Sequence, residues 1–568
     1  MSEKLLERET VSIAAGTANG ASKSASSCCG PSTTGQSTVG LSDIGLSEAT
    51  GTANGASEST SACCGPSSAI GPLPTQTTIN LDTAVPCCPQ PSDPSESCCT
   101  PDSLLKTLQA TTEVLAQVST PIRPAKATAK RVDLPIAIIG GGPIGLAAAA
   151  HLHERGESFV LYEAGASVGE SILSWGHVKL FSPWAYNVDA ASVKLLEANG
   201  WQMPDPEVLP TGQELVEDYL QPLANVPELK PHIKLNSKVT FVGRKGLDKM
   251  KTADRDDRPF VLHIEHQVEG DGDSEQTWVE RVEAGAIIDA SGTWSNPNPL
   301  GSGGVMAIGE DAVKNHILYG IPDVLGRHRT RYAGKHVLVV GSGHSAMNAL
   351  LELKLLKDEE PETQITWAIR KEHLHTIFGG GADDALAARG ELGSLTKSLV
   401  DNGTVTLLTP FFIHEIEQDG ETLNVVGSLG EEDKTVTAVD EIITSTGARP
   451  DFSFLREVRV QGDAALESVP ELAQLIDPNI HSCGTVRPHG EKELRQQEKD
   501  FYVIGMKSYG RAPTFLLATG YEQARSVVAG LVGDWEAAER VELNLPETGV
   551  CNSSIPLYDQ VAPGGTCC

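Results

Sequence analysis

The sequence predicts an α/β fold with two Rossmann-like dinucleotide-binding domains. The first observation is a pair of glycine fingerprints, Gly140–Gly145 and Gly341–Ala346, each between a β-branched run and an Ala/Leu-rich run. The second is that both segments repeat the order strand, glycine turn, helix, strand. The third is a chain of 568 residues, long enough for two or three domains. A chain that holds two dinucleotides is expected to move electrons between them.

The first fingerprint predicts a site for FAD or NAD. Leu134–Ile139 is the expected strand and Leu146–Glu154 the expected helix, with the phosphates at the start of that helix. The next strand, Phe159–Tyr162, ends at Glu163, where a carboxylate suits ribose hydroxyls and repels a 2′-phosphate. The alternative is a glycine-rich turn with no ligand. The expected cofactor contacts in the turn are Gly140, Gly142, Pro143 and Gly145.

The second fingerprint predicts a site for NADPH. It follows the strand Lys335–Val340 and opens the helix Ser345–Leu356. The next strand, Gln364–Ile369, ends in Arg370 and Lys371, and two cations there favour the 2′-phosphate of NADPH. The alternative is that these cations only terminate an exposed strand. The expected cofactor contacts in the turn are Gly341, Gly343, Ser345 and Ala346.

The rest of the core completes the two domains. Ala286–Trp294 is predicted to be a strand that ends in a glycine turn beside the flavin, and Glu441–Pro450 is a matching turn in the second domain. Phe501–Gly505 precedes a predicted helix, Gly520–Leu531, placed for a last flavin contact. Two more expected strands are Lys238–Val242 and Phe260–Ile264. The cofactor contacts expected from these turns are Ser291, Gly292 and Gly505.

Residues 1–130 differ in composition from the core. They are rich in Ser, Thr, Ala, Gly and Pro and show no sustained apolar periodicity, so we expect a disordered extension. The segment Gly16–Ser22 recurs as Gly51–Ser57, and each copy is followed by a Cys-Cys-Gly-Pro-Ser sequence. Such a period could indicate a solenoid, but neither copy has the apolar face that a solenoid needs.

Most of the 12 cysteines form adjacent pairs. Adjacent cysteines close only a strained disulfide ring, so a disulfide framework is a poor explanation. Paired thiolates instead suit thiophilic ions such as trivalent arsenic, antimony or mercury, and the absence of Cys-x₂-Cys disfavours zinc. The alternative is a duplicated tail whose cysteines have no function. The expected ligands are Cys28, Cys29, Cys63, Cys64, Cys87, Cys88, Cys98, Cys99, Cys567 and Cys568; Cys483 and Cys551 stand alone.

Charge and hydropathy exclude several classes of protein. The net charge of −31 makes nucleic-acid binding improbable and does not exclude uncharged arsenite. The first ten residues lack the apolar core of a signal peptide, and the most apolar window, Leu134–Leu152, is interrupted by glycines. We therefore expect a cytoplasmic protein without a membrane span, in which thiols stay reduced.

On these motifs, residues of about 133–535 resemble flavoproteins with two dinucleotide-binding domains, and are most similar to class B flavin monooxygenases. The resemblance implies three-layer (ββα) domains, with the NADPH domain inserted in the FAD domain. It implies FAD and NADPH as cofactors, and O₂ that reacts with reduced flavin to give a C4a-hydroperoxide. The implied limits are 131–328 and 451–540 for the FAD domain and 329–450 for the NADPH domain, flanked by the extension 1–130 and a tail, 541–568.

The sequence departs from that family in one motif. The family's Phe-x-Gly-x₃-His sequence is only echoed, by Ile308, Gly309, His316 and Tyr319.

Dithiol reductases of the same fold need a Cys-x₂-Cys or Cys-x₄-Cys beside the flavin, and this core has neither. The terminal Cys567–Cys568 pair resembles the carboxy-terminal pair of mercuric reductase, but the inner pair of that enzyme is absent.

These observations favour an FAD- and NADPH-dependent monooxygenase that oxidises trivalent arsenicals or antimonials, with tails that concentrate the substrate. No acid–base or nucleophilic constellation is evident, so the chemistry is assigned to the flavin and no catalytic residue is named. The alternatives are a metalloid reductase and a thiol-rich delivery protein.

The segment Trp175–Trp184 could line the flavin cavity or simply pack against its neighbours. The residues His373, His375, Asp383 and Asp384 could bind metal, although a solvated loop is the simpler interpretation.

Overall fold

The computed structural model describes residues 133–269, 275–372, 377–378, 387–478, 486–513 and 515–543. The chain divides into two units, Met1–Ile122 and Arg123–Cys568, and everything described belongs to the second. The N-terminal extension and all twelve cysteines lie outside the described residues. The disorder expected for residues 1–130 therefore stays a prediction.

The first parallel sheet has the strand order β16-β7-β1-β2-β3. Its strands are β1 Ile136–Ile139, β2 Phe159–Tyr162, β3 Ile233–Lys234, β7 Ala286–Asp289 and β16 Phe501–Val503. The central strand β1 pairs with β2 and β7 in register, from Ile136 opposite Phe159 and Ala286. Apolar residues fill all four positions of β1 because both faces of a parallel sheet are covered.

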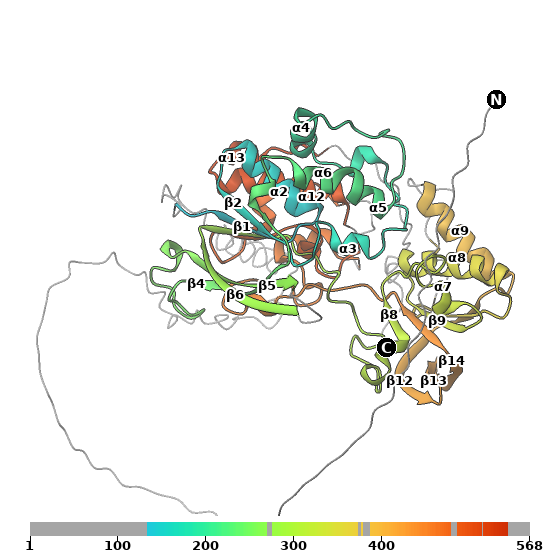
Figure 1. Ribbon diagram of the computed structural model, residues 1–568. Coiled ribbons are helices and arrows are strands. Elements are labelled where there is room, and N and C mark those ends of the chain that lie inside the picture. Colours follow the sequence, from blue (N-terminus) through green and yellow to red (C-terminus); the bar gives the residue numbers. More distant parts are fainter. Residues whose placement is uncertain are drawn as a thin grey trace, which may run out of the picture. The chain divides into compact units, whose positions relative to one another are not determined.

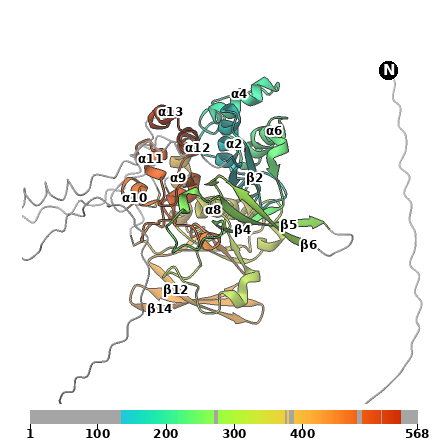
Figure 2. The ribbon, with the colours of Figure 1, turned by 90° about the vertical axis from the view of Figure 1, so that its left-hand side faces the viewer.

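Two layers cover this sheet. The helices α2 (Pro143–Glu154) and α12 (Leu517–Leu531) lie over one face, and a three-stranded antiparallel sheet lies over the other (Figure 1). That sheet consists of β4 Ser237–Arg244, β5 Phe260–Glu269 and β6 Glu275–Ala284. The remaining α-helices of this half are α3 Glu170–Leu173, α4 Ala190–Ala198, α5 Gly212–Leu215, α6 Gln221–Asn225, α10 Pro470–Ile476, α11 Glu491–Leu494 and α13 Trp535–Glu539. Figure 2 shows α10, α11 and α13 grouped beside α12.

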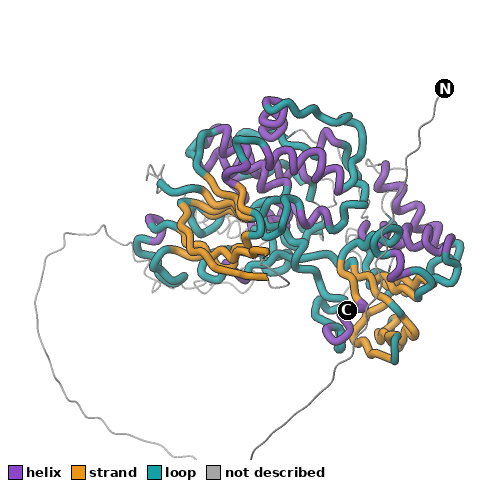
Figure 3. Tube along the Cα trace, viewed as in Figure 1, coloured by secondary structure: helices purple, strands orange, loops and turns teal. Residues whose placement is uncertain are grey.

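The second half repeats the same three layers. Its parallel sheet has the order β11-β10-β9-β15-β8. The strands are β8 Ile317–Tyr319, β9 His336–Val340, β10 Gln364–Ala368, β11 Thr406–Leu408 and β15 Glu441–Thr444. The helices are α7 Arg329–Tyr332, α8 His344–Glu359 and α9 Ala387–Asp401, and the antiparallel sheet is β12 Phe411–Asp419, β13 Thr422–Leu429 and β14 Glu432–Val439. Figure 3 shows the strands of each half gathered beside its helices.

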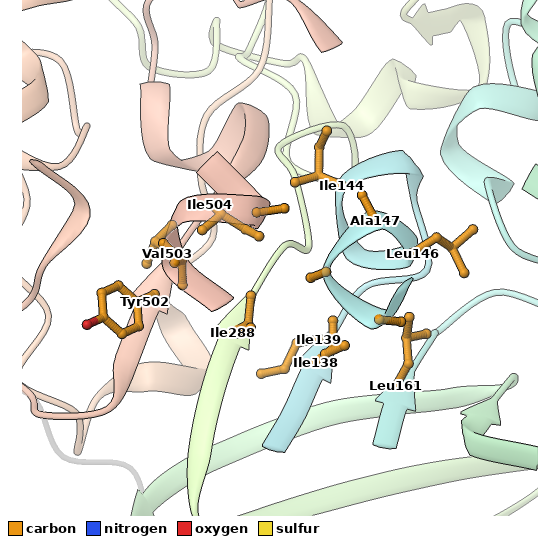
Figure 4. Close-up of a cluster of buried hydrophobic side chains, with 14 of the residues drawn as sticks. Ile138, Ile139, Ile144, Leu146, Ala147, Leu161, Ile288, Tyr502, Val503 and Ile504 are labelled. Carbon is orange, nitrogen blue, oxygen red and sulfur yellow. The ribbon is translucent and has the colours of Figure 1, made fainter. Parts of the chain in front are cut away.

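The connectivity confirms that the second domain is inserted in the first. The strand β16, which follows the second domain in sequence, pairs with β7, which precedes it. Figure 4 shows one core built from both parts of the chain, in which Tyr502, Val503 and Ile504 lie beside Ile288 and Ile144. The fold class expected from the sequence is therefore confirmed for the described residues.

The sequence placed the elements well but misjudged some ends. α2 begins at Pro143 and α8 at His344, because in each case the glycine just before is the N-cap. α12 begins at Leu517, before the expected Gly520. β8 lies N-terminal to residue 329, in the range that we assigned to the first domain, yet it pairs with β15 of the second. The domain limits themselves stay a prediction.

No helix in the described part of the chain is long and apolar enough to cross a membrane.

Candidate nucleotide-binding sites

The first glycine turn joins β1 to α2 in a conformation that requires glycine at two positions. Gly140 has φ +104°, and a Cβ there would lie 2.7 Å from the carbonyl oxygen of Ala290. A Cβ at Gly145 would lie 2.0 Å from the carbonyl oxygen of Gly140, so the helix packs against the turn without a side chain between them. At Gly142 no described atom would lie within 4 Å of a Cβ, so this glycine faces open space.

The start of α2 suits a pyrophosphate. This helix has twelve residues, its N-cap is Gly142, and Pro143 is its first residue. Among the described residues no side chain caps this end, and the first turn holds no acidic residue. The free N–H groups and the positive end of the helix dipole therefore point into the open side of the glycine turn.

The carboxylate of Glu163 is fixed at the end of β2. One oxygen accepts a hydrogen bond from the Gly141 N–H at 2.5 Å and the other from the Gly165 N–H at 2.7 Å. Each oxygen keeps a lone pair for a further donor. A ribose with two hydroxyls fits this carboxylate, and a 2′-phosphate does not.

Two other turns meet the first fingerprint. Ser291 follows β7 and borders Gly140, because a Cβ at Gly140 would lie 2.9 Å from the Ser291 Cα. The next residue, Gly292, has φ +70°. Gly505 follows β16 with φ +69° and packs against Ile144. The Gly505 N–H already donates to Gln523 Oε1 at 2.7 Å, so this glycine contributes close packing and does not offer that N–H to a cofactor.

The second glycine turn has the same backbone design. Gly341 has φ +128°, and a Cβ there would lie 2.2 Å from the carbonyl oxygen of Ser445. Gly343 is the N-cap of α8 and, within the described residues, faces open space. Ala346 is fully buried against the core of this domain, and Ser345 is half-buried in the first turn of the helix. The start of α8 carries no acidic residue, as at α2.

The residues beyond the second strand differ in charge from Glu163. Arg370 and Lys371 follow β10, and both side chains are exposed. The Arg370 guanidinium donates one hydrogen bond, from Nη1 to the Ser302 carbonyl at 2.6 Å. Its other donors and the Lys371 ammonium are the groups that would bind a 2′-phosphate.

The segment Trp175–Trp184 contacts the second domain. His177 Nε2 lies 3.4 Å from Glu352 Oε1 on α8, and the ring of Phe181 meets that of His344 edge-on at 5.2 Å. Trp175 meets Trp294, which follows the Ser291–Gly292 turn, with ring centroids 6.3 Å apart. The packing interpretation of this segment therefore has direct support.

Trp294 connects the neighbourhoods of the two fingerprints. Its ring would lie 3.0 Å from a Cβ at Gly320, which has φ +109°. The Gly320 carbonyl in turn accepts a hydrogen bond from Ser445 Oγ at 2.9 Å, and Ser445 borders Gly341. Sequence reasoning placed Trp294 only at the end of a turn, because the contact with Gly320 depends on how the two domains meet.

Burial perturbs the interdomain pair on α8. Burial raises the pKa of Glu352 to about 7, against the opposing effect of the hydrogen bond from the Val324 N–H. Burial also lowers the pKa of His177. Near neutral pH a fraction of the Glu352 carboxyls is therefore protonated, and the contact with His177 is not a full ion pair.

Some expected site residues have other roles or fall outside the described residues. Gly309 packs on the Ile416 carbonyl, His316 Nδ1 lies 3.0 Å from the Asp440 carbonyl oxygen, and Tyr319 donates to Glu310 at 2.5 Å. This echo of the monooxygenase motif is thus engaged in contacts within the second domain. The possible metal-binding residues His373, His375, Asp383 and Asp384 are not described, and the part of the chain that is described holds no group of three metal-ligating side chains.

Sequence reasoning missed two residues beside the first turn. Asp289 and Lys507 form a fully buried ion pair at 2.7 Å that also contacts Ser291. The available signal was an acid at the end of the otherwise apolar run Ala286–Asp289, since such a buried acid needs a partner.

Comparison with known proteins places the chain in a family. Residues 134–501 match the family model described as pyridine nucleotide-disulphide oxidoreductase. No curated protein matches the sequence. FAD and NADPH, the two cofactors expected from the fingerprints, agree with the family match, whereas the assignment of each residue to a cofactor stays a prediction.

The solved structures that resemble the chain are distant. Bacillithiol disulfide reductase from Bacillus cereus is 19% identical, with 71% of this chain and 99% of that chain covered and a TM-score of 0.49. The cadaverine monooxygenase of desferrioxamine biosynthesis from Erwinia amylovora is 12% identical, with 74% and 99% covered and a TM-score of 0.48. Thioredoxin reductase from T. acidophilum is 14% identical, with 71% and 98% covered and a TM-score of 0.42. Likeness at this level carries no argument about the reaction, but the family match spans most of the chain: this protein belongs to the pyridine nucleotide-disulphide oxidoreductase family.

Proposed function

We propose that this protein is an FAD- and NADPH-dependent monooxygenase that oxidises trivalent arsenicals or antimonials. One observation carries the proposal. The region that matches the family, residues 134–501, contains a single cysteine, Cys483, so it has no cysteine pair for dithiol reduction beside the flavin. A member of this family without that pair needs another electron acceptor, and O₂ is the acceptor that requires no further protein group.

The proposed reaction balances with the two cofactors and O₂. NADPH supplies two electrons, and the lone pair of trivalent arsenic or antimony supplies two more. These four electrons reduce O₂. One oxygen atom bonds to the metalloid and makes it pentavalent, and the other leaves as water with two protons. Bound FAD supplies the chemistry that accepts hydride and activates O₂.

The residues of the chain bind and orient the cofactors. Glu163 holds the ribose of FAD and the start of α2 holds its pyrophosphate, whereas the start of α8 and Arg370 hold NADPH. Trp294 lies between the two fingerprints and would help to shield the bound cofactors from water.

The cysteine pairs are proposed to collect the substrate. Two adjacent thiolates bind trivalent arsenic or antimony, and a tethered site raises the local substrate concentration without new contacts at the flavin. These cysteines lie outside the described residues, so the support comes from their pairing at both ends of the chain. We keep the cytoplasmic location as part of the same proposal, since reduced thiols require it.

The test measures the consumption of NADPH and O₂ by the full-length protein with arsenite or a methylated trivalent arsenical. We expect substrate-dependent consumption of one O₂ per NADPH and one pentavalent product per NADPH. The matched control replaces the ten paired cysteines with serine: turnover at saturating substrate should persist and the KM for the metalloid should rise. NADPH oxidation that continues without O₂ would instead identify a metalloid reductase, and metalloid binding without any NADPH oxidation would identify a delivery protein.

A further inference from the structure

A fully buried ion pair lies beside the first glycine turn. Lys507 Nζ donates to Asp289 Oδ2 at 2.7 Å, and neither side chain is exposed to solvent. Asp289 is the last residue of β7, and Lys507 lies in the 3₁₀ helix Gly505–Tyr509 that follows β16. The two strands are neighbours in the sheet, so both residues reach the same edge of it. Burying two charges costs free energy, which suggests a role other than stability.

The pair is connected to an exposed serine. Ser291 Oγ donates to Asp289 Oδ1 at 2.7 Å and lies 3.0 Å from Lys507 Nζ, which donates to it. The Ser291 N–H also donates to Asp289 Oδ1, at 3.1 Å. Both donors of Ser291 are thus used within the turn, and its hydroxyl oxygen keeps one lone pair for an external donor.

The surroundings of Lys507 strengthen this arrangement. The Lys507 ammonium lies 4.5 Å from the ring centroid of Phe454 and 5.2 Å from that of Phe452. The Ile504 N–H donates to the Asp289 carbonyl at 2.9 Å, which fixes the backbone at the same point. In an apolar setting the charge-assisted hydrogen bonds are stronger than in water, so Ser291 is held in one orientation.

We propose that Lys507 and Asp289 are positioning residues for FAD, which hold Ser291 so that its hydroxyl oxygen accepts a hydrogen bond from the ribityl chain. Ser291 borders Gly140, beside the turn that faces the pyrophosphate, and the ribityl chain is the next part of FAD. A serine that can only accept fits a ribityl hydroxyl and does not fit a phosphate oxygen, which is itself an acceptor. The inference rests on the assignment of FAD to the first fingerprint.

The experiment measures the dissociation constant of FAD by flavin fluorescence and the melting temperature of the full-length apoprotein. Replacing the pair by neutral groups, Asp289→Asn with Lys507→Met, should leave the melting temperature near that of the wild type, because a buried pair adds little net stability. The dissociation constant of FAD should rise roughly tenfold, since Ser291 loses the Lys507 donor and keeps only an uncharged acceptor at position 289.

The serine gives a second arm that keeps both charges of the buried pair in place. Ser291→Ala should raise the dissociation constant roughly tenfold, and Ser291→Thr should restore it because the hydroxyl returns. With FAD analogues that each lack one ribityl hydroxyl, the penalty of Ser291→Ala should vanish for one analogue. A penalty of the same size with every analogue would overturn the inference.

A second buried pair serves as the matched control. Arg525 Nη2 lies 2.7 Å from Glu522 Oε1 on α12. Among the described residues, the further hydrogen bonds of this pair go to the backbone of Ala537, Arg540 and Glu542 and not to the glycine turn. Replacing it by Glu522→Gln with Arg525→Met should leave FAD binding unchanged. Equal FAD binding by the wild type and the Asp289/Lys507 double variant would overturn the inference, whereas a wild type that binds no FAD would instead overturn the cofactor assignment.

Discussion

The two glycine turns share their backbone geometry and differ at the ends of the strands that follow. In each turn the first glycine has a positive φ and lies against a carbonyl of the neighbouring strand's turn, and a later glycine faces open space. The first site then presents the carboxylate of Glu163, held by two backbone N–H groups, and the second presents the exposed cations Arg370 and Lys371. On the proposed assignment, the shared turn accommodates a dinucleotide, and the charge at the end of the next strand distinguishes FAD from NADPH.

The two turns also differ in how closely the helix approaches. Gly145 cannot carry a Cβ, whereas its counterpart Ala346 does carry one and is fully buried. The first helix therefore lies closer to its turn than the second. This contrast provides the prediction with the largest expected effect.

Gly145→Ala should abolish FAD binding. The new Cβ would lie 2.0 Å from the Gly140 carbonyl oxygen, so α2 must move away, at a cost of about 3 kcal/mol in the free energy of unfolding. The measurements are the flavin content of the purified protein and its melting temperature. The matched change Ala346→Gly should cost about 1 kcal/mol and keep FAD. A yellow Gly145→Ala variant with wild-type stability would show that close packing is not required.

Replacing Arg370 and Lys371 together by alanine should weaken the binding of NADPH and leave the binding of NADH unchanged. The loss of charge-assisted hydrogen bonds to the 2′-phosphate should raise the KM for NADPH roughly 10- to 100-fold. The KM for NADH, which lacks that phosphate, is the internal control. If both values stay at the wild-type level, the two cations only terminate an exposed strand.

The helices that follow the two turns should respond to pH in opposite directions. On α2, His151 contacts Asp189. Burial acts to raise the pKa of Asp189, but His151 and the hydrogen bonds from Ser192 lower that pKa overall. That stabilisation is present above the ordinary pKa of an aspartate and is lost as pH falls through the lowered value. On α8, the pKa of Glu352 is raised to about 7, so its stabilisation is present below pH 4.5 and is lost as pH rises to about 7.

Glu352→Gln should therefore remove the loss of stability on the alkaline side. At pH 8 the wild type holds a largely ionised, half-buried carboxylate, and the variant should be more stable by about 2 kcal/mol. Melting temperatures of both proteins between pH 5 and pH 8 provide the measurement. The curves should converge near pH 5; curves that stay parallel across the range would contradict the raised pKa.

Glu163→Gln should have the smallest effect, confined to the first site. The amide nitrogen cannot accept a hydrogen bond from a backbone N–H, so either Gly141 or Gly165 loses its acceptor. We expect the dissociation constant of FAD to rise by roughly fivefold, about 1 kcal/mol, with no change in the KM for NADPH. An altered KM for NADPH would mean that the two sites are coupled through the domain contact.

The sequence predicted the local parts of both sites. Glycine turns, the strands around them and the charge at the next strand end lie within about forty residues of one another, and such short-range patterns follow from backbone sterics and helix dipoles. The same reasoning could not find the role of Gly505 as a packing residue, or the contacts of Gly309, His316 and Tyr319 within the second domain. Those depend on which surfaces meet, and residue spacing contains no information about that.

By itself, the sequence determined that the chain has two dinucleotide turns, that one ends in an acid and the other in two bases, and that its family region lacks a cysteine pair. Only the tertiary structure decided that Lys507 meets Asp289, 218 residues away in sequence, and that Trp294 reaches Gly320 in the other domain. The physical reason is that buried charges and interdomain contacts are paired by the closing of the sheet and the docking of the domains. Local propensity does not encode either event.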